Sequence, residues 1–129
     1  MKYLHDRNII HRDLKPGNVL LDKNFYPHIS DFGLSKISEV GHSYIQSQQC
    51  GTLAYMAPEI IKGEKYGKKA DVYAFGIMMY EIITDSFAYP DLIEGKMTEF
   101  EFIGKVVNKN YRPKFKEGYD ISDSLKEFI

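Results

Sequence analysis

The sequence has little cysteine, little net charge and no long apolar run. A single cysteine, Cys50, excludes an internal disulfide and leaves no zinc site of the usual cysteine spacing. The formal net charge is -1, so the overall balance attracts neither nucleic acid nor an anionic membrane. No stretch approaches the roughly 18 consecutive apolar residues that a membrane span needs. The start, Met1–Asp6, lacks the apolar run of a signal peptide. We therefore expect a cytoplasmic, monomeric domain.

The composition is that of one folded domain. Apolar residues make up 43% of the 129 residues and charged residues 27%, which is ordinary for a globular protein and argues against disorder. Neither internal repeats nor low-complexity tracts interrupt the chain. A chain of this length has room for one modest core.

The local patterns predict one hairpin and one long loop. Val19–Asp22 and Pro27–Ser30 are strand-like runs on either side of turn-forming residues, a pattern that favours a small β-hairpin. The stretch Asp31–Gln49 is polar and rich in serine, glycine and glutamine, so it predicts a long surface loop. Connections of this length in compact domains are usually functional.

Four helices are predicted. Met1–Asp6 resembles the last turns of a helix whose beginning is missing, and Asp71–Thr84 is apolar on nearly every side, which predicts a buried central helix. Thr98–Glu101 matches a capping box that opens an amphipathic helix. Ser122 could cap a last helix, which the sequence leaves in mid-pattern.

Three motifs occur in one order along the chain. They are the loop His11–Asn18 (HRDLKPGN), the triplet Asp31-Phe32-Gly33 and the triplet Ala57-Pro58-Glu59. Each motif alone is weak, but all three in this order leave little room for coincidence. The chain resembles the C-terminal lobe (C-lobe) of eukaryotic protein kinases over essentially its whole length.

The resemblance implies a fold and a division of the chain. The expected fold is mainly α with short β-hairpins, a protein-kinase-like C-lobe with the N-terminal lobe (N-lobe) absent. Residues 1–129 then form a partial kinase domain. Its parts are the catalytic loop 11–18, the activation segment 31–59 and a helical subdomain 71–129.

The resemblance also implies the chemistry of ATP-dependent phosphoryl transfer, with ATP and Mg²⁺ as cofactors and a protein as substrate. Asp13 would accept the proton of the substrate hydroxyl, and Lys15 would supply a positive charge to the transferring group. Asn18 and Asp31 would each give Mg²⁺ one oxygen ligand. Thr52 would hydrogen-bond Asp13 and Lys15. In isolation, Asp13 and Asp31 would each more readily be read as loop-capping carboxylates.

Other positions have structural roles in the family. His11 is expected to be a packed histidine bonded to the backbone, and Phe32 is expected to pack. Asp71 would bond the backbone of the catalytic loop. Leu20 would form an apolar floor under the adenine ring, although a plain core leucine is nearly as good an interpretation.

Substrate class and regulation follow from details of the motifs. Lys15 and Thr52 are typical of serine/threonine kinases, and the stretch GTLAYMAPE (residues 51–59) is similar to the tyrosine-kinase-like group. Arg12 directly precedes Asp13, an arrangement often regulated by activation-loop phosphorylation, in which a phosphate pairs with the arginine. The candidate phosphorylation sites are Ser43, Tyr44 and Ser47, of which we favour Ser47. Ordinary loop residues are the alternative.

The sequence departs from complete kinases in lacking a Gly-rich loop, the lysine-bearing strand and the glutamate of helix C. We therefore expect the missing N-lobe to be a partner in a longer protein. The isolated chain should aggregate and bind ATP weakly or not at all, because the interface with that lobe would be exposed. Two alternatives stay open: a non-catalytic interaction module that binds through the helix 98–107, and a small-molecule phosphotransferase with a kinase-like fold.

Overall fold

A computed structural model describes residues 1–32, 36–37, 50–116, 118–119 and 121–128. The described part is mainly helical, with two antiparallel two-stranded sheets, in agreement with the predicted class. In chain order the elements are α1 Lys2–Asp6, β1 Ile9–Ile10, the 3₁₀ turn η1 Pro16–Asn18, β2 Val19–Leu21, β3 Pro27–Ile29, β4 Lys36–Ile37, α2 Cys50–Leu53, α3 Pro58–Ile61, α4 Lys68–Thr84, α5 Pro90–Ile93, α6 Glu99–Asn108 and α7 Asp123–Phe128.

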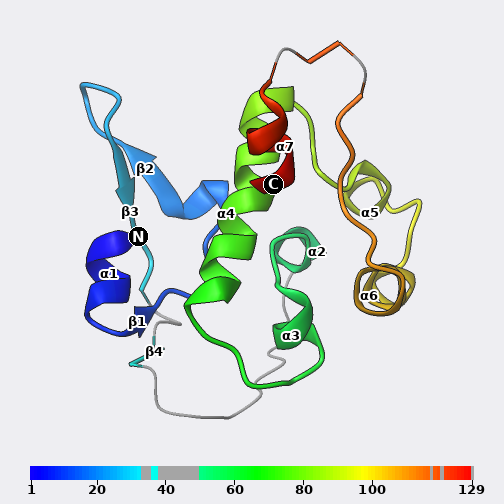
Figure 1. Ribbon diagram of the computed structural model, residues 1–129, viewed down its shortest axis with the longest axis horizontal. Coiled ribbons are helices and arrows are strands. Elements are labelled where there is room, and N and C mark those ends of the chain that lie inside the picture. Colours follow the sequence, from blue (N-terminus) through cyan, green and yellow to red (C-terminus); the bar gives the residue numbers. More distant parts are fainter. Residues whose placement is uncertain (33–35, 38–49, 117, 120, 129) are drawn as a thin grey trace.

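Helix α4 is the central element of the molecule. It runs through the middle, with α1 and the strands on one side and α2, α3, α5 and α6 on the other (Figure 1). The predicted helix over 71–84 is confirmed and begins one turn earlier, at Lys68. It ends at Thr84 and is followed by Asp85, whose φ of 48° is left-handed, a conformation that aspartate adopts more readily than most residues.

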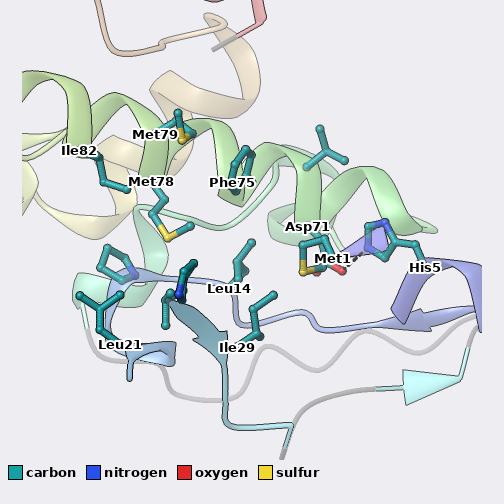
Figure 2. Close-up of a pocket in the computed structure, with 14 residues that line it drawn as sticks. Met1, His5, Leu14, Leu21, Ile29, Asp71, Phe75, Met78, Met79 and Ile82 are labelled. Carbon is teal, nitrogen blue, oxygen red and sulfur yellow. Dashed lines mark hydrogen bonds and ion pairs between the residues drawn. The ribbon is translucent and has the colours of Figure 1, made fainter. Parts of the chain in front are cut away.

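One face of α4 is open, which corrects the expectation that this helix is buried on nearly every side. Ile82 is 66% exposed and Val72 44%. An apolar groove of about 810 Å³ lies along this face. In Figure 2, Met78 of α4 points toward the strands across the groove, which Phe75 and Met79 also line. The other lining residues are Met1, His5, Leu14, Pro16, Val19, Leu21, Pro27, Ile29 and Asp71.

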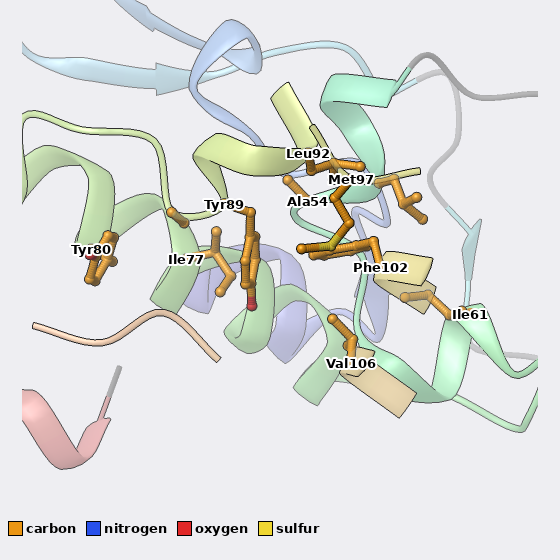
Figure 3. Packing of buried hydrophobic residues seen from close by; sticks show 11 residues of the cluster. Ala54, Ile61, Ile77, Tyr80, Tyr89, Leu92, Met97, Phe102 and Val106 are labelled. Atoms are coloured by element: carbon orange, nitrogen blue, oxygen red, sulfur yellow. The ribbon is translucent and has the colours of Figure 1, made fainter. Parts of the chain in front are cut away.

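The opposite face of α4 packs into the main core. Ile77 of α4, Tyr89 and Phe102 are each at most 2% exposed, and the rings of Tyr89 and Phe102 meet edge to face with centroids 4.8 Å apart (Figure 3). The predicted capping box of α6 is confirmed. The Thr98 hydroxyl accepts a hydrogen bond from the Glu101 amide at 3.2 Å, and the Glu101 carboxylate accepts one from the Thr98 amide at 2.9 Å. The cap therefore fixes the start of the helix that places Phe102 in the core.

The strands form two antiparallel pairs within residues 9–37. The predicted hairpin is confirmed as β2 paired with β3, with Val19 opposite Ile29. Lys36–Ile37 corrects the prediction of an uninterrupted loop over 31–49, because it forms β4 and pairs antiparallel with β1. Such a two-residue strand has no periodicity of its own, so only its distant partner reveals it.

The terminal helices agree with the sequence patterns. α1 occupies the predicted range at the start of the chain. Before α7, the Ser122 hydroxyl accepts a hydrogen bond from the Leu125 amide at 3.3 Å, as predicted for a cap. Among the helices described, none combines the length and the apolar character needed to cross a membrane.

Candidate active site

The loop 11–18, predicted to be the catalytic loop, is attached to α4 through one buried carboxylate. Asp71 is 1% exposed, and its two oxygens accept hydrogen bonds from the backbone amides of His11 and Arg12, each at 2.9 Å. The predicted bond between Asp71 and the loop backbone is therefore present. Arg12 has a left-handed φ of 72°, a strained conformation for a residue with a long side chain. The fixed acceptor on α4 explains how this conformation persists.

His11 is fully buried and bonded to the backbone, as expected. Its Nε2 lies 2.9 Å from the carbonyl oxygen of Ser30, and its Nδ1 accepts a hydrogen bond from the Asp13 amide at 3.3 Å. Because a carbonyl oxygen only accepts, Nε2 carries the hydrogen and donates. Because Nδ1 accepts, it carries no hydrogen, so these contacts fit the neutral ring with its hydrogen on Nε2. Phe32 packs edge-on against this ring with centroids 5.3 Å apart, while 47% of it stays exposed.

The structure brings four of the predicted site residues together. Lys15 Nζ lies 3.0 Å from Asp13 Oδ2 and donates to Thr52 Oγ1 at 3.1 Å. Asn18 Nδ2 donates to the carbonyl oxygen and to Oδ2 of Asp13, at 2.7 and 3.0 Å. Lys15 thus bridges Asp13 and Thr52, which belong to segments far apart in the sequence. Of the two bonds predicted for Thr52, the described contacts contain the one to Lys15.

Asn18 and Asp31 fit a cation that prefers oxygen ligands. Asn18 is 6% exposed, and its amide nitrogen donates to two oxygens of Asp13, which leaves Oδ1 as the atom that could bind a metal. Ser30 donates to the carbonyl oxygen of Asn18 through its amide at 2.8 Å and its hydroxyl at 3.2 Å. Asp31 follows directly, so both predicted ligands lie at the same end of the β2–β3 hairpin.

The number of predicted ligands can be compared with what Mg²⁺ takes from protein. In the described residues no group of three or more histidine, cysteine, aspartate or glutamate side chains could enclose a metal ion. Mg²⁺ commonly takes only one or two ligands from protein and the rest from phosphates and water. An amide oxygen and a carboxylate at one hairpin end therefore suit Mg²⁺ held together with a phosphate ligand.

Comparison with known proteins decides the family. The family model described as the protein kinase domain matches residues 1–129. The chain belongs to the protein kinase family. Its relatives include the protein kinase and PP2C-like domain-containing protein of Arabidopsis thaliana, at 35% identity over 100% of this chain and 23% of that protein.

Two further relatives are named for protein kinase activity. The serine/threonine-protein kinase STY46 of Arabidopsis thaliana is 38% identical over 88% of this chain and 18% of that protein. The dual specificity protein kinase shkA of Dictyostelium discoideum is 37% identical over 98% of this chain and 24% of that protein. This kinase chain thus spans less than a quarter of the length of these relatives.

Other predicted site residues of the kinase lie apart from this cluster. Leu20 is 57% exposed, and because side chains alternate along a strand it faces away from its neighbours Val19 and Leu21, which line the groove. The guanidinium of Arg12 lies 5.6 Å from the ring centroid of Tyr66, a cation–π distance. Ser43, Tyr44 and Ser47 lie outside the described residues.

Sequence reasoning missed two contacts that support the site. His5 Nε2 lies 2.8 Å from Oδ2 of Asp71, so α1 also holds the carboxylate that fixes the loop. On the other side of the site, the Tyr55 hydroxyl donates to Glu81 Oε2 at 2.6 Å. No local pattern predicts either contact, because the two partners of each pair come from distant segments.

Proposed function

We propose that this chain is the catalytic lobe of a protein serine/threonine kinase. It would transfer the γ-phosphoryl group of ATP, with Mg²⁺, to a hydroxyl group of a protein substrate. The bridging position of Lys15 between Asp13 and Thr52 carries the proposal, because it sets a cation and a carboxylate side by side. Phosphoryl transfer depends mainly on such positioning and charge neutralisation.

Each residue of the cluster has a role in this proposal. Asp13 accepts the proton of the substrate hydroxyl and orients its oxygen for in-line attack. Lys15 balances the charge of the transferring phosphoryl group, and Thr52 holds Lys15. Asn18 and Asp31 would bind Mg²⁺, which supplies charge neutralisation at the phosphates when bound. Leu20 would contact the adenine ring with its exposed side chain.

Serine and threonine are the proposed acceptors, and the tyrosine-kinase-like group is the proposed subgroup. The identities of Lys15 and Thr52 and the name of the STY46 relative support this assignment. The name of the Dictyostelium relative, a dual specificity kinase, raises tyrosine as an additional acceptor. Matched peptides that differ only in serine, threonine or tyrosine at the acceptor position would distinguish the two.

Residues 1–129 are proposed to be part of a larger catalytic unit, with the division into catalytic loop 11–18, activation segment 31–59 and helical subdomain 71–129. The open groove beside α4, the exposed Leu20 and the short span relative to the kinase relatives support an N-lobe partner. The isolated chain would then be inactive. A cytoplasmic location remains part of the proposal.

Regulation by phosphorylation is proposed for the segment that contains Ser43 and Ser47. A phosphate there would pair with Arg12, whose guanidinium now lies over Tyr66. If Ser47→Ala leaves the activity of the native kinase and its response to phosphatase unchanged, Ser47 has no such role.

A non-catalytic interaction module is the second candidate. It is favoured by Phe100, which is 85% exposed on α6, the helix over 99–108 within the predicted binding segment. An intact catalytic cluster is not needed for binding alone, and for that reason we rank the kinase first.

The native polypeptide provides the test. An antibody raised against residues 109–123 would isolate it from its own cells, and its mass would be compared with 14.9 kDa. We expect a larger protein that phosphorylates serine or threonine peptides, and an Asp13→Asn variant reduced about 100-fold or more. Asp6→Asn, an exposed aspartate on α1, is the matched control and should keep full activity. A native band at 14.9 kDa without kinase activity would favour the interaction module.

A further inference from the structure

Positive charge is concentrated where α3 is connected to α4. Residues 62–69 (KGEKYGKK), called the basic segment below, hold four lysines and one glutamate and therefore a net charge of +3, in a chain whose total is -1. The segment runs near the lower edge of the molecule in the view of Figure 1. Three of its lysines are exposed and one is partly exposed; the four are Lys62, Lys65, Lys69 and, partly exposed, Lys68.

Most of this charge is not neutralised by neighbouring side chains. Lys62 Nζ lies 3.6 Å from Glu64 Oε1, and because both side chains are exposed this ion pair is weak. Within the part of the chain that the structure describes, no carboxylate lies within ion-pairing distance of the amino groups of Lys65, Lys68 and Lys69. The basic segment therefore presents three unpaired cations at the surface.

Two of these lysines lie where a helix tolerates a cation least. Lys68 and Lys69 are the first two residues of α4, which follows Gly67 and is 17 residues long. The amides at the start of a helix carry partial positive charge, so a cation there lowers stability. Asp71, the acidic residue of this turn, is buried, and its oxygens accept from α1 and from the loop 11–18. Lysines that disfavour their own helix indicate a use outside it.

Two contacts order the basic segment. Gly63 has a left-handed φ of 70°, and its amide donates to the Ile60 carbonyl oxygen at 3.0 Å, which ends α3. The ring of Tyr66 lies with its centroid 5.6 Å from the guanidinium carbon of Arg12. An ordered surface loses less conformational entropy when a partner binds. The contact with Arg12 also places the segment beside the loop 11–18.

We propose that the basic segment is a docking surface for a carboxylate-rich segment of a partner protein. Complementary charge steers such partners together and selects among them. The cations are lysines, which act as separate point charges and suit carboxylates spread along a chain, whereas bidentate recognition of a phosphate is the geometry of arginine. This proposal is independent of the proposed catalytic function.

The test measures binding to the complete protein that contains this chain. The probe is a fluorescently labelled peptide that alternates glutamate with glycine and is as long as the basic segment. Lys65→Glu, Lys68→Glu and Lys69→Glu are combined in one variant. Fluorescence anisotropy should show the affinity falling about tenfold or more, because like charges then face each other.

Two further measurements separate docking from unfolding. The two glutamates at the start of α4 favour the helix, so the variant should have a Tm equal to or above that of the unchanged protein. Raising the salt from about 0.1 M to 1 M shortens the Debye length from about 10 to 3 Å and should weaken binding to the unchanged protein. A second variant with glutamine at the same three positions should lose part of the affinity, and it tests the proposal even if the first does not fold.

The matched control combines Lys23→Glu, Lys109→Glu and Lys116→Glu. It makes the same change of total charge at exposed lysines of other segments, so it should bind the peptide almost as the unchanged protein does. An equal loss of affinity in this control would overturn the proposal, because the attraction would then belong to the protein as a whole.

Three other probes test the chemical class of the partner. They are a peptide with a single phosphoserine, a single-stranded RNA oligomer, and vesicles of phosphatidylcholine and phosphatidylserine. We expect each to bind more weakly than the glutamate peptide at the same salt concentration. Tighter binding of any one of them would reject a carboxylate-rich protein segment as the partner. Because phosphoryl transfer is not measured, a failure of the proposed kinase activity would leave these results unchanged.

Discussion

His5 and Asp71 meet through Nε2 and Oδ2 at 2.8 Å although 66 positions separate them in the sequence. The same carboxylate oxygen accepts the His11 amide, and the other accepts the Arg12 amide. Asp71 thus connects α1, α4 and the loop 11–18. Because three donors meet at Asp71, both oxygens of a carboxylate are needed there as acceptors.

Asp71→Asn should destabilise the chain. Asparagine keeps one acceptor oxygen and turns an NH₂ group toward a buried donor, and an unsatisfied buried donor costs about 1–3 kcal/mol. We expect the free energy of unfolding, measured by urea denaturation, to fall by about that amount. Asp6→Asn, at an exposed position paired with Lys2, is the control. Equal stabilities of the two variants would show that the network at Asp71 contributes nothing.

Phe102→Ala should be among the most damaging substitutions in α6. Phe102 is 1% exposed, and its ring packs against Tyr89, so alanine would leave a cavity that costs about 3–5 kcal/mol. Phe100→Ala removes the same ring two positions earlier, where 85% of the side chain is exposed. We expect less than about 0.5 kcal/mol for that control in the same denaturation experiment. Comparable losses of unfolding free energy in both variants would show that Phe102 does not lie on the buried face of α6.

The capping box makes the stability of α6 depend on pH. Hydrogen bonds from the backbone amide and then the hydroxyl of Thr98 lower the pKa of Glu101 below its ordinary value of 4.5. The stability that Glu101 contributes is therefore present above pH 4.5 and is lost as the pH falls through the lower folded-state pKa. Glu101→Gln should reduce the Tm at pH 7, and the difference from the unchanged chain should shrink toward pH 3.

Glu99→Gln is the control for this pH series. Glu99 is exposed in the same helical turn, but the capping-box contacts belong to Thr98 and Glu101. Its Tm difference should vary much less with pH. A Glu101→Gln difference that is constant from pH 3 to pH 7 would contradict the role of the ionised cap.

The groove beside α4 predicts self-association of the isolated chain. Ile82 is 66% exposed at its edge, and large exposed apolar patches favour association. Ile82→Lys places a cation in the last turn of α4, where the helix dipole favours it. We expect less aggregation by light scattering and little change in unfolding free energy. Phe100→Lys, at a position that is more exposed but lies outside the groove, should reduce aggregation less. The reverse order would show that the surface responsible for aggregation lies on α6.

Much of the site was predictable residue by residue. The resemblance to protein kinases indicated Asp13, Lys15, Asn18 and Thr52, and the structure brings them within hydrogen-bonding distance of one another. Their assigned roles stay predictions. What no motif indicated were the supporting contacts, of His5 with Asp71 and of Tyr55 with Glu81, because these residues gain meaning only from their partners.

The sequence by itself determined the local elements: the β2–β3 hairpin, the capping box at Thr98 and the helix around Asp71–Thr84. Each depends on residues a few positions apart, whose turn chemistry, caps and apolar spacing act along the chain. Only the tertiary structure decided that Lys36–Ile37 pairs with β1, that α4 leaves one face open, and that Glu81 meets Tyr55. These features arise from contacts between segments far apart in the sequence, and such contacts depend on how all the helices and strands pack together rather than on any one stretch of sequence.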